Sequence, residues 1–161
     1  IRMFGKAIPE PRWTDWCGDR DYRYSGRLLS AKTWLPALSA LRAQLESDLA
    51  GVGIQAASGF NHALLNYYPD GDASMGWHRD NERELGERPV ICSVSLGSAR
   101  RFVMRPRARE RRWEQLEWSL GHGDLLVMYG DSQVDWEHAL VKTKTAVGPR
   151  LNITLRSVVC A

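Results

Sequence analysis

His78 and Asp80 are the two residues whose types and spacing point most directly to chemistry. In an extended segment, residues two positions apart point to the same side, so an imidazole and a carboxylate can converge on one metal ion. A third ligand must come from elsewhere, and His138 follows a predicted strand and turn late in the chain. Two histidines and one carboxylate leave coordination positions open, as in the facial triad of non-haem Fe(II) oxygenases. We interpret His62 and His122 as structural, because no partner in the sequence makes them ligands.

A second chemical pattern lies at 150–156, where polar and apolar residues alternate. On a strand, one face would carry two guanidinium groups, an amide and a hydroxyl, which belong to Arg150, Asn152, Thr154 and Arg156. Burying such a face costs free energy unless it binds a partner. A small dicarboxylate would be that partner, because each arginine can bind one carboxylate in a fork geometry. An exposed strand face is the alternative that this stretch alone leaves open. Asn66 and Tyr68 also share a face and could hydrogen-bond a carboxylate, although a strand tyrosine by itself usually indicates packing.

The composition favours one globular domain. The chain has 161 residues, of which 43% are hydrophobic and 25% charged, so disorder is not its dominant state. No apolar run approaches the roughly 20 residues of a membrane helix, so we expect no membrane partner. The three cysteines are too few and too scattered for a disulfide framework or a cysteine-rich zinc site. We therefore expect an intracellular protein (cytoplasmic if bacterial, nuclear if eukaryotic), and nothing in the sequence indicates more than a monomer.

Arginine dominates the basic residues. It supplies 18 of the 22, although the formal net charge is only +3, and seven arginines fall within 100–112. Such a cluster is typical either of a solvated hairpin or of a surface that contacts phosphates, because the guanidinium group suits bidentate phosphate binding.

The periodicity of the chain predicts a mainly β fold with a flanking helix. Leucines at three- and four-residue steps predict a helix over 33–50, with Thr33 as its N-cap, Pro36 in its first turn and Gly51 at its end. Residues 1–30 are rich in turns and aromatic residues, and Pro9 and Pro11 argue against regular structure there. Short strands are predicted at 62–68, 90–96, 101–105, 113–120, 124–129 and 151–159. This pattern favours a double-stranded jelly-roll with the helix covering one sheet face.

Taken together, the motifs resemble those of the AlkB family of Fe(II)- and 2-oxoglutarate-dependent dioxygenases. The matching residues, in order, are Asn66-x-Tyr68, His78-x-Asp80, His138 and Arg150-x-Asn152-x-Thr154-x-Arg156. The similarity extends over nearly the whole chain and is greatest to the subgroup that acts on double-stranded DNA. It implies a double-stranded β-helix and one dioxygenase domain over 1–161. Within that domain, 1–30 would be a nucleotide-recognition segment, 33–50 a supporting helix and 60–161 the jelly-roll core.

The resemblance also implies roles for individual residues. His78, Asp80 and His138 would bind Fe(II), and Arg150 and Arg156 would hold the two ends of 2-oxoglutarate. The residues around that cosubstrate would be Asn66, Tyr68, Asn152 and Thr154.

Further residues would contact the nucleic acid. Tyr24 would stack on a flipped base opposite His78, and Asn81 and Glu82 would lie near the base edge, Asn81 replacing a second acid found in relatives. The stretch Met3-Phe4-Gly5-Lys6 resembles a finger loop that fills the gap left in the duplex. The remaining candidate contacts are Arg12, Tyr22 and Arg23. The arginines of 100–112, with Lys6 and Arg12, would contact phosphates independently of sequence.

The implied activity is the oxidative demethylation of alkylated bases of the 1-methyladenine and 3-methylcytosine type in DNA. It would consume O2, convert 2-oxoglutarate to succinate and release formaldehyde, and its biological role would be DNA repair. Two alternatives stay open. The same chemistry could act on RNA, on single strands or on a protein side chain, or the chain could be a non-catalytic module that binds damaged nucleic acid.

Overall fold

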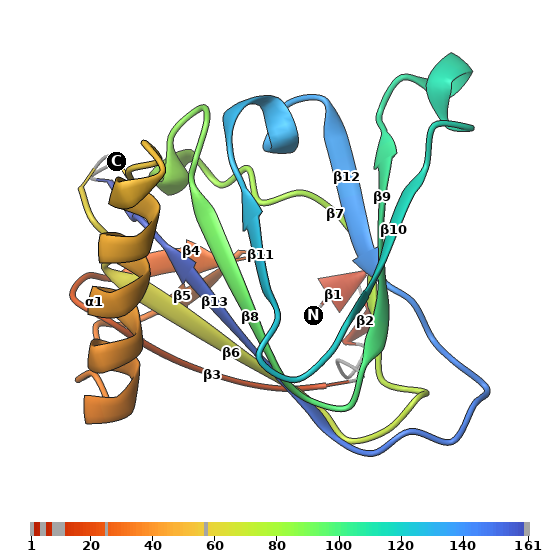
Figure 1. Ribbon diagram of the computed structural model, residues 1–161, viewed down its shortest axis with the longest axis horizontal. Helices are drawn as coiled ribbons and strands as arrows, with labels where there is room; N and C mark the ends of the chain where they lie inside the picture. The colour runs from red at the N-terminus through yellow and green to blue at the C-terminus, as the bar shows by residue number, and fades with distance from the viewer. Residues whose placement is uncertain (1, 4–5, 8–11, 25, 57, 160–161) are drawn as a thin grey trace.

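Two antiparallel sheets form most of the computed structural model, which describes residues 2–3, 6–7, 12–24, 26–56 and 58–159 (Figure 1). The larger sheet has the strand order β11-β8-β13-β6-β3, and the smaller has the order β10-β9-β12-β7. The larger sheet consists of β3 (Trp13–Gly18), β6 (His62–Tyr68), β8 (Ile91–Gly97), β11 (Leu125–Met128) and β13 (Arg150–Arg156). The smaller consists of β7 (Met75–His78), β9 (Arg100–Pro106), β10 (Leu116–Leu120) and β12 (Trp136–Leu140). This arrangement confirms the predicted jelly-roll core.

All six predicted strands are present, with ends shifted by a few residues. The structure adds β7 and β12, which the sequence patterns did not predict. These two strands pair with each other, and β12 also pairs with β9. Because they lie side by side, residues from the middle and from the end of the chain meet in one sheet.

The prediction that the N-terminal segment lacks regular structure is wrong. Pro9 and Pro11 lie outside the described residues, but β3 follows directly and pairs antiparallel with β6 as an edge strand. The strands β4 (Tyr22–Tyr24) and β5 (Arg27–Leu29) form a hairpin, and the short strands β1 (Arg2–Met3) and β2 (Lys6–Ala7) pair with each other. The ladder to β6 gives this segment the hydrogen bonds that its own sequence does not specify.

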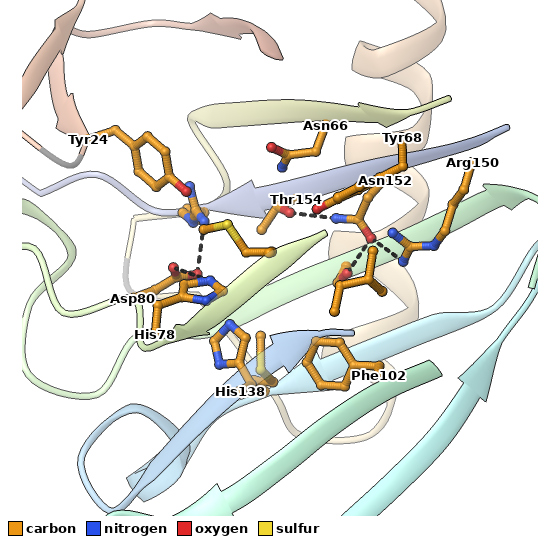
Figure 2. Close-up of a pocket in the computed structure, with 15 residues that line it drawn as sticks. Tyr24, Asn66, Tyr68, His78, Asp80, Phe102, His138, Arg150, Asn152 and Thr154 are labelled. Atoms are coloured by element: carbon orange, nitrogen blue, oxygen red, sulfur yellow. Dashed lines mark hydrogen bonds and ion pairs between the residues drawn. The ribbon is translucent and has the colours of Figure 1, made fainter. Parts of the chain in front are cut away.

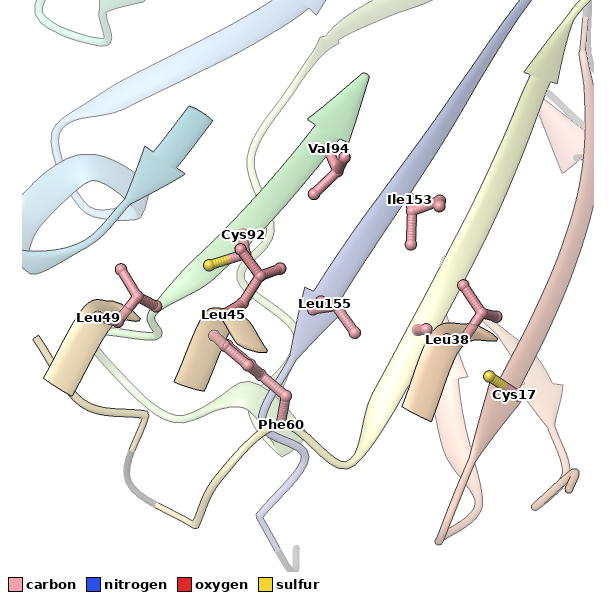
Figure 3. Packing of buried hydrophobic residues seen from close by; sticks show 10 residues of the cluster. Cys17, Leu38, Leu45, Leu49, Phe60, Cys92, Val94, Ile153 and Leu155 are labelled. Carbon is pink, nitrogen blue, oxygen red and sulfur yellow. The ribbon is translucent and has the colours of Figure 1, made fainter. Parts of the chain in front are cut away.

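The helix α1 (Pro36–Gly51) covers the outer face of the larger sheet (Figures 1 and 3). Leu38, Leu45 and Leu49 are buried against Cys92 and Leu155 in one apolar cluster. Burial of each such leucine contributes about 1.5–3 kcal/mol, so this face holds the helix in place. Cys92 is fully buried, and burial raises its pKa to about 12, so its thiol is unreactive at neutral pH.

The predicted N-cap of this helix is wrong. The capping position is Leu35, which makes no side-chain cap hydrogen bond, and the helix begins at Pro36 rather than at Thr33. Proline suits the first helical position because its missing N–H would have no helical partner there. Among the described residues, no helix combines the length and apolar character needed to cross a membrane.

Candidate active site

The three predicted metal ligands come together between the two sheets. His78 ends β7, Asp80 follows it by two residues, and His138 lies in β12 directly opposite His78 in the ladder. The two imidazole rings have centroids 4.2 Å apart. One potential ligand atom from each of the three residues lies within 4.8 Å of the other two (Figure 2). The pairing of β7 with β12 therefore produces the cluster.

The donor atoms of this cluster are oriented to receive a cation. The Nδ1 atom of His78 lies 2.8 Å from the carbonyl oxygen of Gly76, which fixes the ring and leaves Nε2 facing Asp80. Oδ2 of Asp80 accepts a hydrogen bond from Arg156 at 2.8 Å, whereas its Oδ1 is buried without a hydrogen-bond partner among the described residues. An orphaned carboxylate oxygen beside two imidazoles fits a divalent metal such as Fe(II).

The protonation states of the cluster also suit a metal. Burial alone would oppose ionisation of Asp80, but the positive charge of Arg156 and the nearby histidines lower the pKa of this carboxyl to about 2. Burial, reinforced by His78, lowers the pKa of His138 to about 3. At neutral pH, Asp80 is ionised and His138 is neutral, which are the forms that bind metals.

The polar face of β13 is buried, so the alternative of an exposed strand face is excluded. Arg150 and Arg156 are 2% and 3% exposed. Arg150 donates a hydrogen bond to Ser95 Oγ at 2.8 Å. It also donates to Asn152 Oδ1 at 2.7 Å, and Asn152 donates to Thr154 Oγ1 at 2.8 Å (Figure 2). These contacts order the row of polar side chains along the strand.

Both guanidinium groups keep donors without partners. In the described part of the chain, Arg150 Nε and Arg156 Nε and Nη1 are buried and have no hydrogen-bond acceptor. Burial lowers the pKa of Arg150 to about 10, as expected for a guanidinium without a counter-ion. Asn66 and Tyr68 lie opposite Asn152 and Arg150 in the ladder and line the same pocket. The pocket thus offers cationic donors that a dicarboxylate would satisfy.

Aromatic and acidic residues lie near the three predicted metal ligands. Tyr24 lines the pocket, and its ring centroid is 5.4 Å from the guanidinium carbon of Arg156. Tyr22 is 1% exposed and packs edge-to-face on His62.

Burial and the charge of Asp80 raise the pKa of Glu82, which is half-buried, whereas Asn81 is exposed. Arg23 is also exposed, and Phe4, Gly5 and the side chain of Lys6 lie outside the described residues.

Arg12 is buried and contacts a residue of the pocket rather than lying on the surface. It is 8% exposed, and its Nε donates a hydrogen bond to Asn66 Oδ1 at 2.8 Å. This place differs from the surface phosphate contact that the sequence predicts. Arg12 instead connects the start of β3 to a residue that lines the pocket.

The predicted phosphate contact by Arg100 is wrong. This side chain is 2% exposed and donates hydrogen bonds to the carbonyl groups of Asp70, Gly71, Ala73 and Val141. Several other arginines of the cluster pair with glutamates, as in Arg101–Glu117, Arg105–Glu137, Arg111–Glu114 and Arg112–Glu137. Arg107 and Arg109 are exposed and make no ion pair among the described residues, so they are the members best placed for phosphate.

Four residues of the site were missed by the sequence analysis. Ser93 and Ser95 bind the polar row of β13, and Phe102 stacks on His138 with ring centroids 5.4 Å apart. The two serines alternate with Cys92 and Val94, so the period of the strand could have placed them on the pocket side. Gln133 accepts a hydrogen bond from the main-chain amide of Asp80, and no local pattern marks it.

The comparisons with known proteins agree with this geometry. The family described as the 2OG-Fe(II) oxygenase superfamily matches residues 5–156. The chain belongs to this superfamily, whose cofactors are those predicted for the site, Fe(II), 2-oxoglutarate and O2.

Two curated relatives define the resemblance more closely. The human DNA oxidative demethylase ALKBH2 is 37% identical over 165 residues, which cover 98% of this chain and 60% of the relative. The mouse alpha-ketoglutarate-dependent dioxygenase alkB homolog 3 is 36% identical over 159 residues, which cover 94% of this chain and 53% of the relative. The predicted likeness to the AlkB family is thereby confirmed, and the chain spans between half and two thirds of the length of these relatives.

A solved structure supports the fold. The structure of OsALKBH1 superposes with a TM-score of 0.64 at 16% identity, and the match covers 89% of this chain and 77% of that one. At this identity the likeness concerns the fold, which agrees with the jelly-roll core.

Proposed function

We propose that the chain is an Fe(II)- and 2-oxoglutarate-dependent demethylase of alkylated DNA bases, of the 1-methyladenine and 3-methylcytosine type. The observation that carries the proposal is a single pocket in which His78, Asp80 and His138 face the buried guanidinium groups of Arg150 and Arg156. The names of relatives that are DNA oxidative demethylases support the choice of substrate.

In this proposal, His78, Asp80 and His138 hold the iron. Bound Fe(II), with 2-oxoglutarate and O2, supplies the oxidation of the methyl C–H bond that water cannot achieve, and the resulting N-hydroxymethyl group leaves as formaldehyde. In this arrangement Arg156 contacts both a metal ligand and the cosubstrate. Its Nη2 is occupied by Asp80, while its Nε and Nη1, which have no hydrogen-bond partner among the described residues, would bind one carboxylate of the cosubstrate. Arg150 binds the other carboxylate, with Asn66, Tyr68, Asn152 and Thr154 around the molecule.

The substrate base enters from the side of Tyr24. A methyl group on the Watson–Crick edge weakens base pairing, so extrusion of the damaged base costs less than extrusion of a normal one. Tyr24 then stacks on the base opposite His78, and Asn81 and Glu82 read its edge. We assign Tyr22, Arg23 and Arg12 to the surroundings of the base, and residues 4–6 to a finger that fills the vacated stack.

The remaining assignments follow from this function. We propose one dioxygenase domain over 1–161, with the nucleotide-recognition segment at 1–30, the supporting helix at 33–50 and the jelly-roll core at 60–161. Double-stranded DNA is the proposed partner, the proposed state is a monomer, and the proposed location is inside the cell.

A methylated duplex oligonucleotide, incubated with the protein, Fe(II), ascorbate and 2-oxoglutarate, tests the proposal by mass spectrometry. We expect the oligonucleotide to lose the mass of one CH2 unit per methyl group, together with formation of succinate. Asp80→Ala should abolish both, whereas Asp48→Ala, at an exposed position of α1, should retain them. Faster turnover on RNA or single strands would favour another substrate, and binding of methylated DNA without turnover of 2-oxoglutarate would favour a non-catalytic module.

A further inference from the structure

We propose that Gln133 is a positioning residue of the metal site, which holds the main chain of Asp80 so that its carboxylate faces the two histidines. The side chain of Gln133 is buried, with 2% of its surface exposed. Its Oε1 accepts a hydrogen bond from the main-chain amide of Asp80 at 2.9 Å. The inference rests on the proposed function in one respect only, because it takes His78, Asp80 and His138 as metal ligands.

The orientation of the Gln133 amide group follows from its partners. The amide nitrogen of Asp80 can only donate, so the oxygen of Gln133 must face it. The Nε2 atom of Gln133 lies 3.4 Å from Met128 Sδ and 3.4 Å from Ser132 Oγ, which are its acceptors on the other side. The main-chain carbonyl of Gln133 also accepts a contact from Arg79 at 3.4 Å. Gln133 therefore contacts two successive residues of the segment that carries the metal ligands.

The position of Asp80 explains why such support is needed. It lies beyond the last residue of β7, where the strand ladder no longer holds the backbone. Its only charged hydrogen-bond partner among the described residues is Arg156, which binds Oδ2. If the main chain were free to move, the carboxylate could turn so that both of its oxygens bind the guanidinium group, the geometry that such pairs favour. Anchoring the main chain keeps Oδ1 available beside the histidines.

Gln133 also connects the ligands from the two parts of the chain. It ends the short helix η3 (Gly130–Gln133), and β12 with His138 begins three residues later at Trp136. A hydrogen bond from Asp80 to Gln133 thus ties the segment after β7 to the segment before β12. Supporting hydrogen bonds of this kind around metal ligands are worth about 10- to 100-fold in metal affinity.

Titration of the metal-free protein with Co(II) tests the inference through the visible absorption of the bound ion, which reports its ligand set. Gln133→Met keeps the length of the side chain but replaces the acceptor oxygen by a weakly accepting thioether. We expect it to bind Co(II) about 10- to 100-fold more weakly and with an altered spectrum. Gln133→Glu keeps an acceptor oxygen and should restore the affinity and the spectrum.

Asn61→Leu is the matched control, because Asn61 is another buried amide that hydrogen-bonds the main chain, here that of Val158. It should lower the melting temperature but leave Co(II) binding unchanged. The inference is overturned if Gln133→Met binds Co(II) like the wild type, if Gln133→Glu is equally impaired, or if Asn61→Leu loses the same affinity. Asp80→Ala separates the two proposals, since unchanged Co(II) binding by that variant would contradict the metal site itself.

Discussion

Arg156 and Asp80 form a buried ion pair with 2.8 Å between Nη2 and Oδ2, and both side chains are 3% exposed. The pair joins the proposed cosubstrate-binding strand β13 to the proposed metal ligands. The mutual charges raise the pKa of Arg156 and lower that of Asp80, so both groups stay ionised at neutral pH. If these proposed roles hold, a change at either residue should affect metal binding, cosubstrate binding and the stability of the fold.

Substitution of Arg156 should consequently have two separable effects. Arg156→Met leaves the carboxylate of Asp80 buried and unpaired, which should lower the free energy of unfolding by about 3–5 kcal/mol. Arg156→Lys keeps the charge but loses the fork geometry. It should therefore raise the KM for 2-oxoglutarate while lowering the free energy of unfolding less than Arg156→Met does. Denaturant unfolding and succinate formation measure the two effects. Equal losses of cosubstrate use and of DNA binding would indicate misfolding and contradict the specific role.

The buried imidazole of His62 should make the metal-free protein sensitive to acid. His62 is fully buried with neither ring nitrogen hydrogen-bonded among the described residues, and burial lowers its pKa to about 3. In the unfolded chain the pKa is about 6.5, so below that pH the unfolded state binds the extra proton. With respect to His62, the free energy of unfolding therefore has its full value above pH 6.5. It decreases as the pH falls towards 3, by about 1.4 kcal/mol per pH unit.

The variant His62→Phe tests this pH dependence, because phenylalanine keeps an aromatic ring against Tyr22 but does not titrate. Its unfolding free energy should fall less steeply between pH 6.5 and 3 than that of the wild type. His138 titrates in the same range and leaves a residual slope in both proteins. Identical slopes for the two proteins would contradict this prediction, because they would mean that His62 takes up its proton as readily in the folded state as in the unfolded chain.

Arg100 should stabilise the fold rather than bind DNA. It donates to carbonyl groups of both the 70–73 segment and Val141, so Arg100→Met removes the side-chain donor to the carbonyl groups of Asp70, Ala73 and Val141. We expect the unfolding free energy to fall by about 3 kcal/mol, the scale of hydrogen bonds to a charged group. Arg101→Met, which removes only an exposed pair with Glu117, should cost less than about 1 kcal/mol. A small loss for Arg100→Met in urea unfolding would contradict this role.

The exposed arginines of the same hairpin should instead determine the salt dependence of DNA binding. Arg107→Gln combined with Arg109→Gln should reduce the slope of log affinity against log salt by about 1–2, since each phosphate contact contributes roughly 0.9. Fluorescence anisotropy with undamaged duplex DNA measures the slope. Arg111→Gln is the control, because this residue is already paired with Glu114. An unchanged slope in the double variant would place the phosphate contacts elsewhere.

Local periodicity explains which elements were predictable. Alternation identified the polar face of β13 because successive strand residues point to opposite faces, whichever strands lie beside them. The leucine spacing identified α1 for the corresponding reason. In contrast, β7 and β12 contain no β-branched residue, and they are strands because each finds hydrogen-bond partners in the smaller sheet.

The residue types and spacings that nominate the metal and cosubstrate sites, and the apolar patterns that build the sheets, can be recognised without coordinates. The packing of the strands was needed to show that His138 lies opposite His78, that Arg100 points inward and that Gln133 accepts a hydrogen bond from the main chain of Asp80. The reason is physical. A local pattern reports the direction of a side chain relative to its own element, whereas a hydrogen bond between distant segments depends on how the elements pack together.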